Sequence, residues 1–349
     1  MNKALVEPRV LLVAYLSFFI LAARTLSLES ALIVILGAGA FLAGCRLADG
    51  LKIKRAGLKI GFPALEPLFA VSAAALILDL LHVGGIPLLD PSLHSRHLTA
   101  YLLLGFPIVP IASILLADYL EKKKGFLAQA LVTLPTLMLT LLLGYRTDIV
   151  AAIVSFTIVY YLFGRISGKK LAALAASAIF AIVLLGFVKA SAAGSVAGPV
   201  DVFAGRIEGT ASIFDYIVLH SSPFGSLRGE LHNAALSTLT YHLIPGPVIG
   251  PRALIAEFFG ARDDVTFTAT MLGPLYLDFG IFGVMLGLGI LGFILSLAFR
   301  SIDADKRNAG VYAVLLAFSF VAIETGILDI VLFYFFGALF YLLVCLRAR

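Results

Sequence analysis

The sequence has few charged residues and almost no cysteine. Asp, Glu, Lys and Arg make up only 13% of its 349 residues, whereas hydrophobic residues make up 61%. Typical soluble domains contain about 25% charged residues. A soluble enzyme of this length could not cover its core with so few charges, so that class is excluded. The two cysteines, Cys45 and Cys345, lie in apolar runs and provide neither a disulfide framework nor metal-ligand spacing. Tryptophan is also absent, which favours no particular function.

Apolar runs of about 20 residues recur along the whole chain, and each is long enough to cross a bilayer. They predict transmembrane helices at residues 9–27, 30–48, 64–83, 99–118, 126–144, 148–164, 171–188, 270–299, 309–325 and 329–346. The first run has no small-residue cleavage site before Arg24, so we expect a permanent helix. The predicted fold is an all-α polytopic membrane protein. Residues 1–349 would form a single integral membrane domain of about ten transmembrane helices.

Positive charges in the short connections indicate the orientation, because such loops are enriched in Lys and Arg on the cytoplasmic side. With a cytoplasmic N-terminus, the inner side receives most of the 26 Lys and Arg residues: Lys3, Arg9, Arg46, Lys52, Lys54, Arg55, Lys59, Lys122, Lys123, Lys124, Arg165, Lys169, Lys170, Arg300, Lys306, Arg307, Arg347 and Arg349. The pattern predicts a multi-pass plasma-membrane protein with both termini in the cytoplasm.

The basic residues left on the outer side are nearly all arginines. They are Arg24, Arg96, Arg146, Lys189, Arg206, Arg228, Arg252 and Arg262, and all six histidines fall on the same side. Arginine binds phosphate and carboxylate through a planar, bidentate fork, whereas lysine is a hydrated point charge. This sorting predicts an extracytoplasmic site that handles an anion.

Two short outer segments carry helix-breaking or charged residues. In the segment 83–98, Gly84, Gly85, Pro87 and Pro91 interrupt an apolar stretch. This mixture suits a chain that dips back into the membrane interface, and an ordinary loop with an apolar lining is the alternative.

The turn at 144–148 places Arg146 and Asp148 between two strongly apolar runs, where charges are costly. Either Arg146 faces an anionic headgroup with Asp148 orienting it, or the two residues form a local pair at the interface.

The long connection 190–269, between the seventh and eighth predicted helices, contains no GxGxxG, P-loop, HExxH or GxSxG motif. Its length predicts a packed functional loop, with short helices at 211–219 and 253–259. If 226–241 is helical, Arg228 and His232 share one face and combine a phosphate clamp with a group that moves protons near neutral pH. Asp263 and Asp264 have no further acidic or histidine ligands nearby, so we predict no metal site.

Several ionisable residues fall in the outer thirds of the predicted helices: Asp79, His82, Asp278, Glu324 and Asp329. Each alone is explained by snorkelling toward the interface. Their common depth indicates a shared site.

At these segments the chain resembles the oligosaccharide repeat-unit polymerases, the O-antigen polymerase (Wzy-type) family. The likeness rests on Gly84–Leu89, on Gly144–Thr147, on the element from Ile244 to Arg252 in the long loop, and on the stretch Thr270–Gly283. The resemblance implies a lipid-carrier glycosyltransferase (GT-C-like) fold. It also implies an extracytoplasmic active site, polyprenyl- or dolichyl-(pyro)phosphate-linked oligosaccharide substrates, and metal-independent transfer that uses arginines and no cofactor.

The resemblance and the chemistry together give a set of candidate residues. Arg146, Arg206, Arg228, Arg252 and Arg96 are predicted to bind pyrophosphate, with Asp148 and Asp278 as orienting residues. A departing anion needs preorganised positive groups, and the acceptor hydroxyl needs a base. His232 is the first candidate for that base and His242 the second, with Glu208 or Glu230 as substitutes.

Other functions stay open from the sequence. A ligase or another lipid-linked glycosyltransferase would share the leaving group and differ in the acceptor. A transporter or flippase for an anionic lipid is the non-enzyme alternative, although such proteins often show internal repeats that this chain lacks. Membrane lipid, a flippase and a chain-length regulator are the expected partners, and no nucleic acid is expected.

Overall fold

The computed structural model describes residues 3–51, 65–88, 90, 93, 100–144, 146–192, 198–240, 243–247, 249–261 and 266–326. Within these ranges the chain forms helices and no strand. In chain order they are η1 (Lys3–Val6), α1 (Val10–Leu21), η2 (Ala23–Thr25), α2 (Leu28–Asp49), α3 (Leu65–Val83), α4 (Ala100–Gly105), α5 (Ile108–Glu121), α6 (Phe126–Leu142), α7 (Arg146–Leu162), α8 (Gly168–Ala192), α9 (Pro199–His220), α10 (Glu230–Leu239), α11 (Pro251–Phe258), α12 (Gly273–Ala304) and α13 (Asn308–Thr325).

Helices occur in every predicted transmembrane segment up to residues 309–325, and the segment predicted at 329–346 lies outside the described residues. Among the described residues, five stretches are long and apolar enough to cross a membrane: Leu28–Asp49, Leu65–Val83, Tyr101–Glu121, Gly273–Ala304 and Asn308–Thr325. Shorter apolar helices accompany them at α1, α6 and α7. The all-helical membrane fold is therefore confirmed, and the number of spans stays a prediction.

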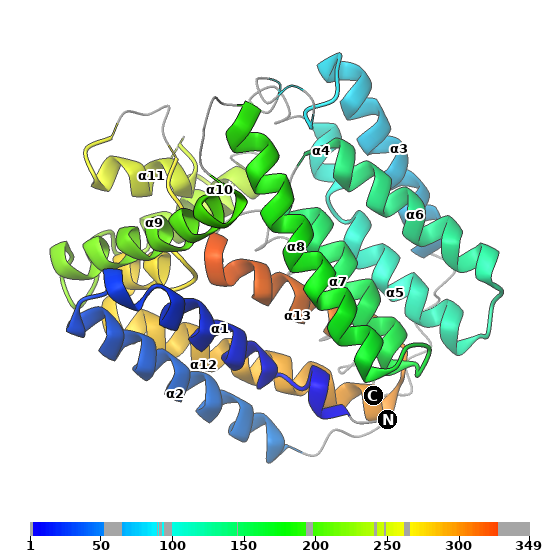
Figure 1. Cartoon of the computed structure of the whole chain (residues 1–349), viewed down its shortest axis with the longest axis horizontal. Coiled ribbons are helices and arrows are strands. Elements are labelled where there is room, and N and C mark those ends of the chain that lie inside the picture. The colour runs from blue at the N-terminus through cyan, green and yellow to red at the C-terminus, as the bar shows by residue number, and fades with distance from the viewer. Residues whose placement is uncertain are drawn as a thin grey trace.

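The helices pack around α13, which contacts α5, α7, α12 and α1. Tyr312 of α13 is fully buried, and its hydroxyl donates a hydrogen bond to the carbonyl of Val6. On the other side of the molecule α2 lies along α12 at very short distance (Figure 1). A Cβ atom on Gly44 would stand 1.9 Å from the carbonyl oxygen of Gly289. Small residues allow this close approach of two membrane helices.

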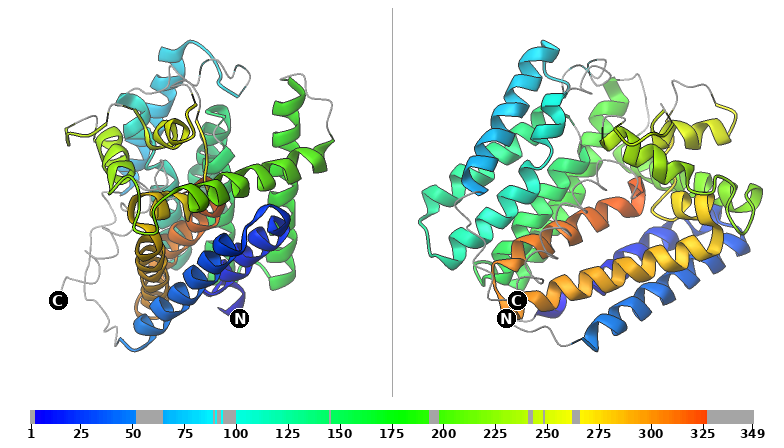
Figure 2. Two further views of the ribbon diagram at one scale, coloured as in Figure 1. Left: turned by 90° about the vertical axis from the view of Figure 1, so that its left-hand side faces the viewer. Right: turned by 180° about the vertical axis from the view of Figure 1, so that it is seen from behind.

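The helices α9, α10 and α11 lie at the end of the molecule opposite η1 (Figures 1 and 2). α9 contacts α1, α2 and α12 where these helices begin or end at that side. Asp215 of α9 accepts a hydrogen bond from the backbone amide of Ser27 at 2.7 Å, directly before α2 begins. The long connection is thus packed against the membrane helices by specific contacts.

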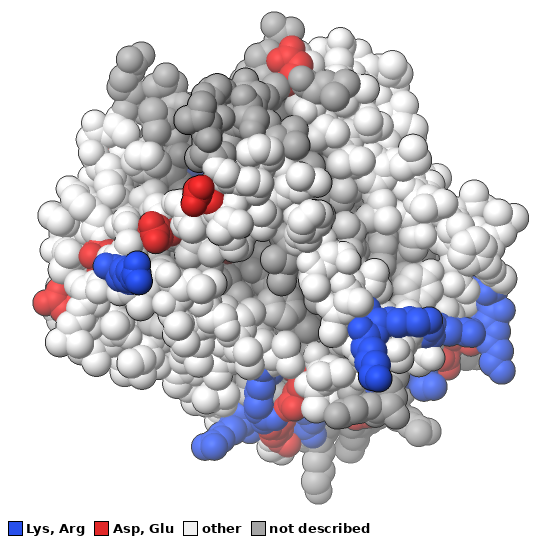
Figure 3. Space-filling view, viewed as in Figure 1, with Lys and Arg blue, Asp and Glu red and all other residues white. Residues whose placement is uncertain are grey.

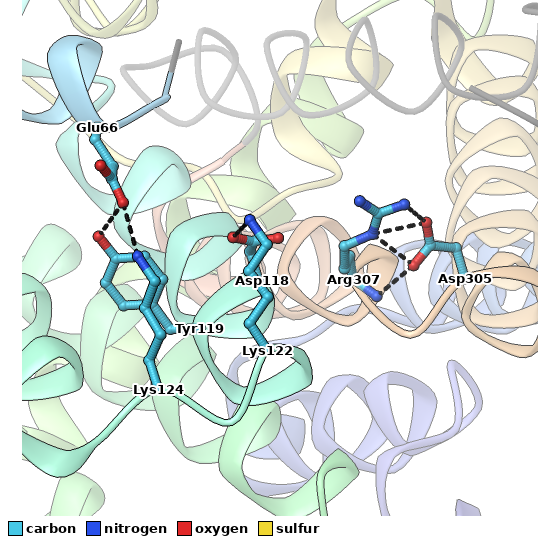
Figure 4. A network of polar contacts seen from close by, with 7 residues as sticks. All are labelled: Glu66, Asp118, Tyr119, Lys122, Lys124, Asp305 and Arg307. Carbon is cyan, nitrogen blue, oxygen red and sulfur yellow. Dashed lines mark hydrogen bonds and ion pairs between the residues drawn. The ribbon is translucent and has the colours of Figure 1, made fainter. Parts of the chain in front are cut away.

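Lys and Arg side chains gather along the opposite edge of the molecule, where α5 joins α6, α7 joins α8 and α12 joins α13 (Figure 3). Polar contacts stabilise two of these connections, α5–α6 and α12–α13 (Figure 4). Glu66 accepts hydrogen bonds from the Tyr119 hydroxyl at 2.7 Å and from Lys124 Nζ at 3.0 Å. This basic edge is the one that the charge pattern predicts to be cytoplasmic.

Asp305, just after α12, accepts hydrogen bonds from the guanidinium of Arg307 at 2.5 to 2.9 Å. Burial raises the pKa of the Asp305 carboxyl, but the hydrogen bonds and the charge of Arg307 outweigh burial and bring the pKa below its ordinary value. The pair therefore stabilises the α12–α13 turn above the ordinary pKa of aspartate, and this contribution is lost as the pH falls through the lowered pKa.

Candidate active site

The described part of the long connection contains three helices, α9, α10 and α11. Two helices were predicted there, and a third, at 226–241, was considered only as a possibility. The helix predicted at 253–259 corresponds to α11. The helix predicted at 211–219 is the second half of the much longer α9. Pro199 occupies the first turn of α9, and Asp201 accepts a hydrogen bond from the amide of Gly198 at 3.3 Å, so the helix begins earlier than expected.

Arg228 and His232 were expected to share one helical face if residues 226–241 were helical, and the structure does not meet this condition. α10 begins only at Glu230, and Arg228 lies in the preceding turn with a left-handed φ of 51°. Gly229 follows it with a φ of 98°, which prevents the helix from extending back toward Arg228. Arg228 is exposed and lies in the turn that leads to His232.

Asp278 of α12 holds the first turn of α10. Its carboxylate accepts hydrogen bonds from the amide of Leu231 at 3.2 Å, from the amide of His232 at 3.0 Å and from His232 Nδ1 at 2.5 Å. A carboxylate at a helix N-terminus satisfies free amides and interacts favourably with the helix dipole. Asp278 is only 1% exposed. One buried acid from a membrane helix therefore fixes both the start of α10 and the ring of His232.

α12 is broken directly after this acid. Gly280 has φ 62° and ψ −148°, which is not helical. The amide of Ile281 donates to the carbonyl of Pro223 at 3.0 Å, and the carbonyl of Leu277 accepts from the amides of residues 226–227 at 2.7 and 3.0 Å. The loop before α10 thus replaces the hydrogen bonds that the break removes. Irregular backbone at membrane depth is tolerated where it is buried in protein or lines a cavity.

This arrangement can transfer protons. An ionised carboxylate only accepts hydrogen bonds, so the His232 Nδ1 proton points to Asp278 and Nε2 is left to accept a proton. The buried carboxylate then stabilises the imidazolium that forms. The imidazole is 29% exposed, and Arg228 stands on the same turn. The His232–Asp278 pair and the exposed Arg228 therefore lie within a few residues of the start of α10, at the end of the molecule that carries α9–α11.

A family model described as "Putative O-antigen polymerase" matches residues 4–336. The chain belongs to the O-antigen polymerase family. An uncharacterized protein of Methanocaldococcus jannaschii is 30% identical to it over 319 residues, which cover 88% of this chain and 84% of that protein. No solved structure matches the chain. Family membership confirms the resemblance seen in the sequence and places the protein among membrane proteins of polysaccharide biosynthesis.

Two of the sequence elements that resemble the polymerase family contact each other. The amide of Leu88, in the first outer segment, donates to the carbonyl of Leu142 at 3.3 Å. Gly144 follows with a φ of 71°, and a Cβ atom there would stand 3.0 Å from the backbone of Leu88. The interrupted segment is therefore packed on the turn that precedes Arg146. The third element lies close to α10, since a Cβ atom on Gly246 would stand 2.8 Å from the side chain of Ser237 and 3.0 Å from the carbonyl oxygen of Asn233.

Arg206 forms an ion pair with Glu324, which joins α9 to the end of α13. Both side chains are partly exposed. Glu208, two residues further along α9, is exposed. This ion pair clamps α9 to α13, and the predicted role of Arg206 in binding pyrophosphate stays a prediction.

A charge swap tests this clamp. The variant R206E is expected to lower activity by loosening α9, and R206E/E324R is expected to recover most of that loss because the pair is restored in reverse. The stability change of either single variant should stay below about 1 kcal/mol, as for exposed ion pairs. Polymer length on a gel and thermal unfolding in detergent measure both effects. If the double variant R206E/E324R stayed inactive, Arg206 would instead act on the substrate anion.

The other predicted residues occupy several places. Arg252 lies partly buried in the first turn of α11, and Asp148 is buried in the first turn of α7. Arg146 is the first residue of α7, but its side chain is outside the described part of the structure. Arg96 and His242 lie outside the described residues as well. The roles of all these residues, including those of His232 and Asp278, stay predictions.

Neither the helix break nor the loop that fills it can be recognised from the sequence. Glycine is common in membrane helices, so Gly280 in an apolar run reads as an ordinary helical residue. Gly225 was equally inconspicuous, although a Cβ atom there would stand 2.2 Å from the carbonyl oxygen of Asp278. Among the described residues no three His, Cys, Asp or Glu side chains are grouped to hold a metal ion. Metal-independent transfer stays a prediction.

Proposed function

We propose that this chain polymerises lipid-linked oligosaccharide repeat units at the extracytoplasmic face of the plasma membrane. The growing glycan is transferred from its polyprenyl-(pyro)phosphate carrier to a sugar hydroxyl of another lipid-linked unit. The observation that carries the proposal is the contact of His232 with the buried Asp278, at a broken membrane helix in a member of the polymerase family.

The proposed reaction assigns each group one step. His232 Nε2 accepts the proton of the acceptor hydroxyl while the oxygen attacks the anomeric carbon of the donor glycan. The bond between that carbon and the phosphate oxygen breaks, and the lipid pyrophosphate leaves with the bonding electrons. Arg228, together with Arg146 and Arg252, neutralises the departing anion, the task that preorganised cations perform in such transfers. Asp278 keeps Nδ1 protonated and holds the ring in place.

The remaining architecture belongs to the same proposal. It comprises ten spans, cytoplasmic termini, an active site at the end that carries α9–α11, and a GT-C-like arrangement. A flippase that delivers the lipid-linked unit and a chain-length regulator would be partners of such an enzyme. The basic edge in Figure 3 supports this orientation by the positive-inside rule.

Deletion of the gene in its host tests the reaction. We expect the ladder of surface glycan to collapse to single repeat units that remain on the lipid carrier, and the wild-type gene to restore the ladder. Full-length polymer stranded on lipid would overturn the proposal in favour of a ligase. The purified protein in proteoliposomes supplied with the host's lipid-linked unit should form the ladder without other proteins. If it only moves the unit across the bilayer, the protein is a flippase.

A further inference from the structure

Phe279 occupies a special position between the buried Asp278 and the break at Gly280. The centroid of its ring lies 5.1 Å from that of the His232 ring, with 46° between the planes. Two of its ring atoms would be 3.4 Å from a Cβ atom on Gly229. The residue is nevertheless 41% exposed. One part of the ring thus packs on the turn at 229–232, and the rest is open.

Three kinds of binding group therefore surround Gly229. Arg228 is its neighbour in the chain, so their Cα atoms are about 3.8 Å apart. His232 provides a proton acceptor on the same turn, and Phe279 covers the glycine with an aromatic ring. An isoprenoid chain would use only the ring. A sugar would use all three groups. One of its hydroxyls would face His232, its C–H face would stack on the ring of Phe279, and Arg228 would bind a phosphate.

We propose that Phe279 is the floor of the acceptor-sugar subsite. The C–H bonds of a pyranose carry partial positive charge and stack on the negative face of an aromatic ring. A sugar stacked there presents its hydroxyl to His232. This inference rests on the proposed function and deepens it, because it names the residue that positions the acceptor.

Phe282 provides a matched comparison on the same helix. Its ring stacks with that of Phe224 at 6.4 Å and 20°. Phe282 is 67% exposed and lies beyond the break, in the continuous part of α12. It shares residue type, helix and exposure to the surroundings with Phe279, but it is not packed on the His232 turn.

The absence of tryptophan from the chain allows a direct binding test. F279W and F282W each introduce a single tryptophan. The probe is the host's repeat-unit oligosaccharide, released from its lipid by mild acid. Because this molecule has no lipid phosphate, no transfer occurs and the signal reports binding alone. The emission of F279W is expected to shift and saturate, whereas F282W should not respond. No shift in F279W, or equal shifts in both, overturns the proposal.

Kinetics provide the second readout. With the radiolabelled released oligosaccharide as acceptor and the intact lipid-linked unit as donor, F279L should raise the acceptor KM about two- to tenfold, the ratio that aromatic contact energies correspond to. The donor KM and kcat should not change, and F279Y should resemble the wild type. A rise in donor KM alone would show that the ring contacts the lipid tail. A saturable F279W signal together with full activity of H232A would refute the proposed catalysis and leave the sugar subsite intact.

Discussion

Replacing His232 by alanine is expected to lower the rate of polymerisation by about 10²- to 10⁴-fold, the range typical of losing a general base. The physical reason is that the substitution removes the imidazole that Asp278 orients, which is the proposed acceptor of the hydroxyl proton. Glycan transfer from the lipid-linked unit, measured in proteoliposomes, gives the rate. The fold should survive, because the amides of residues 231–232 still bind Asp278.

Asp278 provides a second, different variant of the same pair. D278N retains an oxygen that accepts from the amides of α10, but its amide group does not stabilise a protonated imidazole. We expect a large loss of kcat with little change in the acceptor KM. E230Q is the control, since Glu230 is exposed on the same turn. Wild-type rates in H232A would remove His232 from the mechanism, and a large loss in E230Q beside them would make Glu230 the base.

The positions of the membrane helices could be predicted from the sequence because they depend on local composition. Runs such as 30–48 and 309–325 correspond closely to α2 and α13. The end of α9 at His220 was predicted to within one residue by the helix expected at 211–219. Its start could not be predicted, since the helix is amphipathic and its beginning depends on Pro199 and Asp201. Arg228 was misplaced because the positive φ angles of residues 228–229 are tertiary features.

In the candidate site, too, single residues could be predicted from the sequence but the contacts between them could not. His232 was predicted from its side-chain chemistry, and Asp278 from its position in the outer third of a predicted membrane helix. The two predictions were independent of each other. Their contact joins residues 46 positions apart and lies directly before the break of α12 at Gly280. The break itself depends on a loop that supplies replacement hydrogen bonds, and no local pattern encodes such a partner. Arg206 is a similar case, since its partner Glu324 is 118 positions away.

The break predicts that G280A is among the most damaging single substitutions in the chain. A Cβ atom there would stand 1.9 Å from the carbonyl oxygen of Pro223, and the backbone is in a region that is essentially restricted to glycine. The strain alone corresponds to about 1–3 kcal/mol. Relief requires the loop to move away, which removes the hydrogen bonds to Leu277 and displaces Asp278 from α10.

G280A is therefore expected to lose both thermal stability and activity, whereas H232A loses activity alone. Unfolding temperature in detergent and glycan transfer in proteoliposomes separate the two. G39A is the matched control, because Gly39 lies in a membrane helix and a Cβ atom there would have no neighbour within 4 Å. If G280A behaved like G39A, α12 could run straight through residue 280 and the loop would not be needed for the site.

The double variant G225A/G280A tests whether the two glycines serve one contact. Gly225 has a φ of 90°, and a Cβ atom on it would stand 2.2 Å from the carbonyl oxygen of Asp278. Each single substitution should therefore separate the same loop from the same break. Effects on one shared contact are not additive, so the double variant should unfold at nearly the temperature of the worse single variant. Full additivity would show that the loop and the break are stabilised independently, and that His232 is positioned by Asp278 without help from the loop.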